Sequence, residues 1–560
     1  MLTLMHDVVV IGAGLSGLRV AIELVDACDV AVVTKVHPLR SHSVAAQGGI
    51  NAAFGPSDTW QAHAFDTVKG SDYLADQDVV ELLAKDGPRA VIENERWGTA
   101  FSRTEDGRIA QRPFGGAGFP RTCYAADRTG HNLLHTTFEQ ATRKGVKFYN
   151  EWFATSLVKS GSGVCGLTAL EIPSGEVHPI SAKAVVIATG GYGRIYARST
   201  NALINTGDGC ALALDVGVPL KDMEFVQFHP TTLYGSNILI SEAARGEGGL
   251  LFNSKDERFM KNYAPSAMEL APRDVVARAI QTEINEGRGF ENAYVHLDIR
   301  HLGKDRIAER LPGIREISIH FADVDPVDRP IPIQPGQHYS MGGVDCDKNG
   351  TTVLKGLYSL GEAACMSVHG ANRLGGNSLL ETLVFGRIVG VAVKDYLKTT
   401  GRVEKSNLGG GLRRTTERMQ ALLSKGTGQS PSVIRSELCS MMNQYVGIFR
   451  DSQGLSIALN MIKSLQERSR KMTAGCTDSR FNYALIRALE LQNMLQLAEV
   501  TAVSALAREE SRGAHSRTDF PKRDDQRFLK HTVVTKTKGR LVVGYKPVNL
   551  GMFQVKEREY

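Results

Sequence analysis

Three glycines near the N-terminus have the spacing of a dinucleotide-binding turn. Gly12, Gly14 and Gly17 form a Gly-x-Gly-x-x-Gly pattern between an apolar run at 5–11 and a segment of helical periodicity. In such a turn the first glycine permits the tight bend, the second lets a pyrophosphate approach the backbone, and the third lets helix and strand pack. A glycine-rich turn without a ligand is the alternative. The flanking strand and helix favour binding, because the helix N-terminus then faces the phosphates.

Two later segments bear on which dinucleotide binds. ATGG at 188–191 and GLYSLGEAA at 356–364 each end an apolar strand at glycines, and Glu362 closes the second. A classical NAD-binding domain needs neither segment, whereas a flavin-binding Rossmann domain is typically discontinuous along the chain. The order of these segments therefore favours FAD. The carboxylate that usually binds the adenosine ribose is absent, since the second strand ends in Thr34 and Lys35.

The helices and strands that must position these residues are those of an α/β protein. We expect several domains, because 560 residues exceed one ordinary domain. The first βαβ unit contains a helix that we expect to reach about Cys28. The Gly- and Ala-rich stretch at 38–56 has little periodicity, and long irregular segments in compact proteins are usually functional. Beyond it the patterns predict helices at 75–97 and 131–144, strands over 145–191 and 530–545, and a helix at 378–397.

The chain changes character at about 229 and again at about 340. Residues between these points carry more charge, more proline and no nucleotide motif. We therefore expect an inserted domain between these two points. The predicted architecture is a discontinuous Rossmann-like FAD-binding domain (1–228 and 341–405), an α+β capping domain (229–340), a helical bundle (406–510) and a small tail domain (511–560).

Composition excludes several classes of protein. The net charge is only +6, and the basic residues form no clustered stripe along the sequence, which argues against a nucleic-acid binder. No run of 18 apolar residues exists to span a membrane. The eight cysteines are scattered without a Cys-x-x-Cys, so no zinc ribbon, iron–sulfur binding run or other metal site is expected. The first strand begins near His6, which leaves no room for a signal peptide, and scattered cysteines fit a reducing compartment.

Several long motifs occur in one order along the chain: RSHSVAAQGGI, FVQFHPT, RGEGG, APRDVV, HYSMGG, GEAACMSVHGANRLGGNSL and ESRGAHSRTDFPKRDD. Over essentially its whole length the chain resembles the flavoprotein subunit of succinate dehydrogenases and fumarate reductases, the respiratory complex II family. The resemblance implies FAD bonded through its 8α carbon to His42 of RSHS. An imidazole on the ring withdraws electron density and raises the potential of the flavin. L-aspartate oxidase and adenylylsulfate reductase look similar elsewhere but lack this histidine.

The resemblance also implies substrate-binding residues for a dicarboxylate. These are His229, Ser241, His338 and Arg373. Two carboxylates need paired donors, and arginine offers a bidentate fork. Ser241 replaces a threonine that is frequent in the family but keeps the hydroxyl, and Ala244 stands where many relatives have cysteine.

The catalytic residues that the resemblance implies are Arg273 of APRD, with Glu242 and Arg245 as a relay behind it. Succinate would give a hydride to flavin N5 from one carbon and a proton to Arg273 from the next. Because arginine is not normally deprotonated in proteins, Arg273 must pass one proton on as it receives another. A solvated arginine at the start of a helix, paired with Asp274, is the alternative.

The FAD contacts predicted in the same way span the chain from the glycine turn to the helix at 378. They are Gly12, Gly14, Gly17, Thr34, Lys35, Ser41, His42, Gln47, Gly48, Gly49, Ala188, Gly190, Asp208, Glu362, Ser378 and Leu379.

The resemblance implies a subunit of a larger complex. Its partners would be an iron–sulfur protein and membrane-anchor subunits with quinone, which would hold all iron–sulfur clusters and any haem, on the cytoplasmic face of a bacterial cytoplasmic membrane. Gln47 favours succinate oxidation, because some fumarate reductases carry glutamate there, but fumarate reduction stays open. A soluble enzyme like L-aspartate oxidase and a noncatalytic flavoprotein are further alternatives; His42 argues against the first and Arg273 against the second.

Overall fold

The computed structural model describes residues 3–401, 408–423 and 428–558. In this part of the chain a seven-stranded sheet has the order β6-β2-β1-β9-β8-β7, and β16 also pairs with β9. Strands β6, β2, β1, β9 and β16 are parallel, while β8 and β7 extend the sheet in antiparallel pairing. The strands are β1 (Leu4–Ile11), β2 (Val30–Thr34), β6 (Lys147–Asn150), β7 (Trp152–Ser160), β8 (Gly163–Glu171), β9 (Val177–Ile187) and β16 (Leu357–Ser359).

The parallel strands of this sheet end at one level. Ile11 pairs with Val33 and Ile187, and Ile187 also pairs with Ser359, although β16 follows β9 by a long stretch of chain. The glycine turn after β1 therefore meets the turns after β2, β9 and β16. Ligands of open α/β sheets bind in the crevice at these carboxyl ends.

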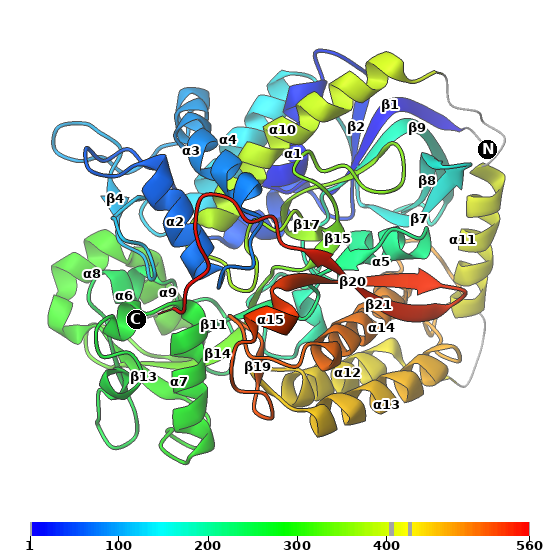
Figure 1. The fold of residues 1–560 in the computed structure, drawn as a ribbon. Helices are drawn as coiled ribbons and strands as arrows, with labels where there is room; N and C mark the ends of the chain where they lie inside the picture. The colour runs from blue at the N-terminus through cyan, green and yellow to red at the C-terminus, as the bar shows by residue number, and fades with distance from the viewer. Residues whose placement is uncertain (1–2, 402–407, 424–427, 559–560) are drawn as a thin grey trace.

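Helices pack around the seven-stranded sheet (Figure 1). The predicted helices at 75–97, 131–144 and 378–397 are found within two residues of their expected bounds. The helix at Trp60–Gly70 was not predicted. Close packing of α1 on α10 depends on Gly386, where a Cβ atom would lie 2.6 Å from Cγ of Arg19. The helices are α1 (Leu15–Leu24), α2 (Trp60–Gly70), α3 (Gln77–Trp97), α4 (Thr129–Arg143), α5 (Asp208–Asp215) and α10 (Asn377–Thr399).

The expectation that the first helix reaches Cys28 is wrong, since α1 ends at Leu24. The N–H groups of Ala27 and Cys28 both donate to the carbonyl of Leu24, which closes a turn. This early end has a physical reason. Asp29 already pairs with Asp7, so the chain must reverse before residue 29 for β2 to lie beside β1.

A second sheet of four antiparallel strands has the order β11-β14-β13-β12 and its own apolar core. Figure 1 labels β11, β13 and β14 of this sheet. Strand β11 runs through the predicted boundary at 229, and β14 ends at the predicted boundary at 340. The domain boundaries themselves stay a prediction. The elements are β11 (Val226–Leu233), α6 (Ala243–Gly246), β12 (Leu250–Phe252), α7 (Arg273–Asn285), β13 (Val295–Asp298), α8 (Lys304–Arg310), α9 (Pro312–Ala322) and β14 (Ile331–Ser340).

The C-terminal third begins with long helices and ends in a hairpin. The predicted boundary at 405–406 lies outside the described residues. The helices are α11 (Leu408–Leu423), α12 (Pro431–Tyr445), α13 (Ser452–Ser469), α14 (Tyr483–Ala507) and α15 (Asp525–Phe528). The hairpin of β20 (Lys530–Thr537) and β21 (Arg540–Pro547) joins a sheet with β10 (Leu220–Lys221), β15 (Gly343–Asp345) and β17 (Ala364–Cys365).

Short strand pairs complete the fold. They are β3 (Ile50–Asn51) and β4 (Gln111–Arg112) on either side of β5 (Thr122–Cys123), and β18 (Phe449–Arg450) beside β19 (Ser516–Arg517). Among the described residues, no helix combines the length and the apolar character that a membrane crossing requires.

Candidate active site

A cavity of about 710 Å³ lies between the carboxyl edge of the seven-stranded sheet and the four-stranded sheet. All of the predicted cofactor and substrate residues line it except Gly17, and the catalytic candidates Arg273 and Glu242 line it too. Gly17 packs behind the glycine turn and Arg245 lies behind Glu242. The fold therefore gathers residues from position 12 to position 379 around one space.

The glycine turn has the close contacts that its pattern predicts. Gly12 has a φ of +108°, and a Cβ atom there would lie 2.2 Å from the carbonyl oxygen of Ala188. A Cβ atom on Gly17 would lie 1.9 Å from the carbonyl oxygen of Gly12. Any side chain at either position would separate α1 from β1 and β9. Gly14 is the residue before α1, so the free N–H groups of that helix face the cavity.

Lys35 makes a buried charge cluster at the end of β2. Its Nζ lies 2.7 Å from Oδ2 of Asp208, 2.6 Å from Oε1 of Glu490 and 3.0 Å from Oγ1 of Thr206. Burial lowers the pKa of Lys35, but the two carboxylates outweigh it and raise the pKa above its ordinary value. The carboxylates beside this strand end thus come from α5 and α14 and pair with Lys35. Glu490 was not predicted, because nothing near it in the sequence marks the contact.

His42 lies in the irregular segment after β2, at the cavity wall. Its Nδ1 accepts a hydrogen bond of 3.2 Å from the N–H of Ala202, and Nε2 lies 3.3 Å from Nδ2 of Asn201. Desolvation, helped by the guanidinium of Arg194, lowers the pKa of His42 to about 4. The imidazole is therefore neutral near pH 7.

Arg273 and Glu242 form a buried ion pair. Glu242 Oε2 lies 2.8 Å from Nε and 2.7 Å from Nη2 of Arg273, whose side chain is 7% exposed. The other carboxylate oxygen of Glu242, Oε1, accepts a 2.7 Å hydrogen bond from the N–H of Gly115 and lies 3.8 Å from Nη2 of Arg245. Burial raises the pKa of Glu242, but the two guanidiniums outweigh it and hold the pKa below its usual value. Because Arg273 faces Glu242 and not solvent, its pairing with Asp274 as a surface residue is excluded.

Two histidines of the four-stranded sheet lie together in the cavity. The ring centroids of His229 and His338 are 4.9 Å apart. Burial, with nearby arginines and, for His338, His229 itself, holds both pKa values well below the ordinary value, so both rings are neutral. His338 is the extra residue of a β-bulge, because Gln227 pairs with Tyr339 and Phe228 pairs with Gln337. Bulges re-aim side chains beside active sites in this way.

Gln227 connects two arginines of the cavity, Arg273 and Arg373. Its Oε1 accepts from Nη1 of Arg273 at 3.2 Å and from Nη2 of Arg373 at 3.1 Å. Its Nε2 donates to Oδ1 of Asn372 and to the carbonyl of Arg373, so the amide orientation is fixed. Arg373 also donates to Oγ of Ser378, and burial beside Arg273 lowers the pKa of Arg373 to about 9. Gln227 was not predicted, although it stands in the FVQFHPT motif two residues before His229.

The remaining predicted residues close the cavity from several sides. Burial raises the pKa of Glu362 to about 7, and its Oε1 accepts from the N–H of Ser340 at 2.9 Å. Gln47 donates to the carbonyl of Leu239, and Ser241 Oγ accepts from the N–H of Ala243. Phe114, which was not predicted, leaves so little room that a Cβ atom on Gly48 would lie 2.8 Å from its ring.

Buried polar atoms without a protein partner line this cavity, as a polar ligand requires. In the described chain they include Oγ of Ser41, Oε1 of Gln47, Nδ2 of Asn205 and Nε of Arg373. Together with the close backbone approach at Gly12, these atoms fit an extended dinucleotide such as FAD.

Comparison with known proteins agrees with this arrangement. The family model described as "FAD binding domain" matches residues 7–379, and "Fumarate reductase flavoprotein C-term" matches residues 435–560. The chain is 47% identical to a fumarate reductase flavoprotein subunit of Mycobacterium tuberculosis (strain ATCC 25618 / H37Rv), over 100% of both chains. It is 44% identical to a succinate dehydrogenase flavoprotein subunit of Rickettsia bellii, over 97% of this chain and 95% of the other.

Solved structures give the same result. A chain of "Quinol-Fumarate Reductase with Menaquinol Molecules" superposes with a TM-score of 0.96 at 39% identity, over 99% of this chain and 100% of the other. A chain of "Mycobacterium smegmatis Sdh1 in complex with UQ1" superposes with a TM-score of 0.88 at 35% identity, over 98% of this chain and 95% of the other. The chain therefore belongs to the family of FAD-dependent flavoprotein subunits of succinate dehydrogenases and fumarate reductases.

Proposed function

We propose that this chain oxidises succinate to fumarate with bound FAD and passes the electrons to an iron–sulfur partner subunit. The observation that carries the proposal is the buried Arg273–Glu242 pair, with Arg245 behind it, in the same cavity as Arg373, His229 and His338. The cationic side chains there outnumber the ionised carboxylate. Such a site favours a dianion, because its field is not screened by water.

Arg373 is the proposed clamp for one substrate carboxylate. Its Nε has no protein partner, which leaves part of the guanidinium fork for a ligand. The neutral rings of His229 and His338, with the hydroxyl of Ser241, are the proposed hydrogen-bonding partners of the substrate carboxylates. Fixing both ends aligns the two central carbons for loss of hydrogen.

Arg273 is the proposed acceptor of the proton. FAD, when bound, supplies the two-electron acceptor for the hydrogen that leaves the neighbouring carbon. As a proton arrives at Arg273, another leaves along its existing contact with Glu242, so the guanidinium never loses its charge. Arg245 keeps Glu242 ionised between turnovers. Burial of all three side chains keeps water out of this path.

FAD would extend across the cavity from the Lys35–Asp208 cluster to the loop at Gln47. Its pyrophosphate would bind the turn of Gly12 and Gly14, and the flavin would lie near Gly48, Gly49, Ser378 and Leu379. Thr34, Ser41, Ala188, Gly190 and Glu362 would complete the contacts. His42 is the proposed 8α-histidyl ligand. A backbone N–H occupies its Nδ1, whereas Nε2 contacts only the side-chain amide of Asn201, so Nε2 is the proposed nitrogen for bond formation.

Closure of the inserted segment on the nucleotide-binding part is the proposed way to assemble the site, with hinges near 228 and 340. The register shift opposite Gln227 and Phe228, where His338 is the extra residue of β14, interrupts the strand pairing beside both positions and supports hinges there. The proposed partners are an iron–sulfur protein and membrane-anchor subunits with quinone, which would place this chain on the cytoplasmic face of a bacterial membrane. The names of related quinol fumarate reductase and Sdh1 structures support such partners.

Fumarate reduction is the second candidate, and the 47% identity to a fumarate reductase subunit favours it as much as Gln47 favours oxidation. We expect the purified chain with FAD to reduce an artificial electron acceptor when given succinate, and to oxidise a reduced dye when given fumarate. The ratio of the two rates at matched potentials assigns the direction. Activity with L-aspartate in place of succinate, or with neither, would contradict the proposal.

Gln227→Glu tests whether this amide holds the two arginines for a dianion. A carboxylate here would pair with Arg273 and Arg373 and compete with the substrate, so we expect KM for succinate to rise at least about tenfold, equivalent to about 1.4 kcal/mol. Gln281→Glu is the matched control. Gln281 is half-buried farther along α7, and its side-chain amide donates to Oδ1 of Asn285. An unchanged KM for Gln227→Glu would remove this role.

A further inference from the structure

The C-terminal segment after β21 is fixed along the surface of the nucleotide-binding part (Figure 1, red coil). The N–H of Asn549 donates to Oδ1 of Asp76, and the carbonyl of Asn549 accepts from the N–H of Gln77. The Gln77 side chain bonds both backbone groups of Phe553, at 2.7 and 2.8 Å. The Phe553 ring packs edge-on against Phe65, 5.5 Å between centroids. These contacts lead the chain to α7.

Arg558, near the end of this segment, joins two parts of the molecule. Its Nη2 lies 3.1 Å from Oδ2 of Asp72, between α2 and α3, and 2.8 Å from Oδ2 of Asp274, on α7. The Asp274 side chain has no exposed surface, and that of Arg558 is 10% exposed. One guanidinium therefore bridges the nucleotide-binding part and the helix that begins with Arg273.

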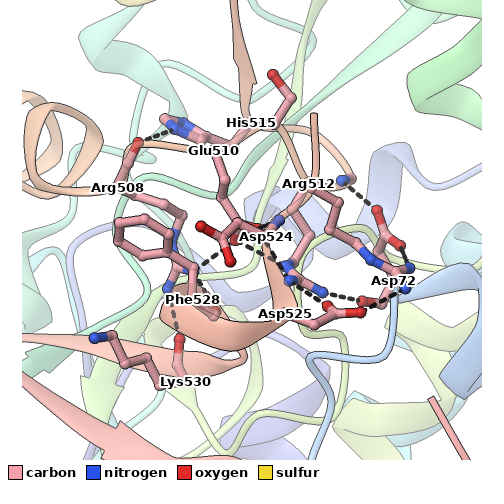
Figure 2. Close-up of polar contacts among 12 residues, drawn as sticks. Asp72, Arg508, Glu510, Arg512, His515, Asp524, Asp525, Phe528 and Lys530 are labelled. Carbon is pink, nitrogen blue, oxygen red and sulfur yellow. Dashed lines mark hydrogen bonds and ion pairs between the residues drawn. The ribbon is translucent and has the colours of Figure 1, made fainter. Parts of the chain in front are cut away.

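The anchor on the nucleotide-binding side is itself rigid. Figure 2 shows Asp72 at the edge of a network that includes Glu510, Arg512 and Asp525. Asp72 accepts from the N–H of Gly513 at 2.9 Å and from Arg523 at 2.8 Å, and its carbonyl accepts from Arg512 at 3.0 Å. Such a cross-linked group offers a fixed reference point for Arg558.

Two arginines, Arg558 and Arg278, pair with the buried carboxylate of Asp274. It lies in the first turn of α7, and Oδ1 has no protein partner, while Oδ2 contacts Arg558 and Arg278. Burial raises the pKa of Asp274, but both guanidiniums outweigh it and hold the pKa below its usual value. Arg278 in turn donates to the carbonyl of Gly513, so both partners of Asp274 are tied to the C-terminal part of the chain.

We infer that Arg558 is a positioning residue for Arg273, and that it acts by holding Asp274 and the start of α7 against Asp72. This rests on the proposed role of Arg273 in proton transfer. Arg273 precedes Asp274 directly, so a shift at the start of α7 moves the guanidinium relative to Glu242. A misplacement of about 1 Å at a reacting group costs on the order of 100-fold in rate.

Arg558→Gln tests the inference in the full chain with FAD, because glutamine is too short to span Asp72 and Asp274. We expect kcat for succinate to fall at least about tenfold while the affinity for malonate, a dicarboxylate that cannot be dehydrogenated, stays within about threefold. Amide hydrogen exchange over residues 273–285 should speed up. Arg558→Lys keeps a cation there and should recover part of the rate. Arg527→Gln is the control, since Arg527 pairs with Glu509 and both side chains are exposed.

A double variant separates positioning from charge burial. Arg558→Gln alone leaves the buried Asp274 carboxylate with Arg278 as its remaining partner and should lower Tm. Adding Asp274→Asn removes the bridge without leaving a buried carboxylate that lacks one of its partners, so Tm should recover while kcat stays low. If the double variant also recovered kcat, the inference would be wrong. It would be wrong too if Arg558→Gln lowered Tm but left kcat and the hydrogen exchange of α7 unchanged. If the unmodified chain does not oxidise succinate, the proposed function fails, and hydrogen exchange in α7 still reports whether Arg558 holds this helix.

Discussion

Arg273→Lys should lower succinate oxidation by about 100- to 10,000-fold, the range that a positioned acid–base group contributes. A lysine ammonium is a single point charge, so it cannot keep the contacts that Arg273 makes with Glu242 through Nε and Nη2 and with Gln227 through Nη1. The positive charge would remain beside Glu242. Folding, FAD content and malonate affinity should therefore change little.

Steady-state rates with succinate, together with malonate titration of the flavin absorbance, measure this prediction. Arg288→Lys is the matched control, because Arg288 pairs with Glu283 in the same part of the chain but does not line the cavity. Turnover of the Arg273 variant within tenfold of the unmodified chain would remove Arg273 from the mechanism. A parallel loss of malonate binding would instead assign Arg273 to substrate binding.

The parts of the site that the sequence predicts correctly depend on local backbone geometry. The turn at Gly12 and Gly17 follows from φ and from contacts with β9, and its spacing is visible in a short stretch of sequence. The strand ends at Ile187 and Ser359 are likewise marked by the glycines that follow them. The proposed catalytic and substrate residues came from long motifs, and the fold brings all of them except Arg245 to the wall of one cavity.

Residues that act through tertiary contacts carry no such mark. Glu490 reaches Lys35 from α14, and its helix is apolar enough to be taken for bundle core alone. Gly115 must lack a side chain because Oε1 of Glu242 would lie 2.6 Å from a Cβ atom there, yet the loop around it has no regular pattern. Gln227 gains its role only when the fold brings Arg273 of α7 and Arg373 to the same side-chain oxygen. In each case the partner lies far away in the sequence.

His42→Ser should abolish covalent FAD. In the unmodified chain, flavin fluorescence should follow the protein band near 60.9 kDa after denaturation in acid, whereas flavin of the variant should separate from it. His37→Ser is the control, because His37 is an exposed histidine at the start of the same irregular segment. Flavin that leaves the unmodified chain under these conditions, or stays with the His42 variant, would contradict the assignment.

The same variant should lose succinate oxidation more than fumarate reduction. Without the electron-withdrawing imidazole the flavin potential falls, and for a two-electron couple each decrease of about 30 mV makes oxidation of the substrate tenfold less favourable. Fumarate reduction gains driving force from the same change. Arg273, Arg373 and Gln227 should keep their positions in the variant, since they hold one another through hydrogen bonds that do not involve His42. Opposite responses of the two rates therefore separate a change in potential from damage to the site, which would lower both together.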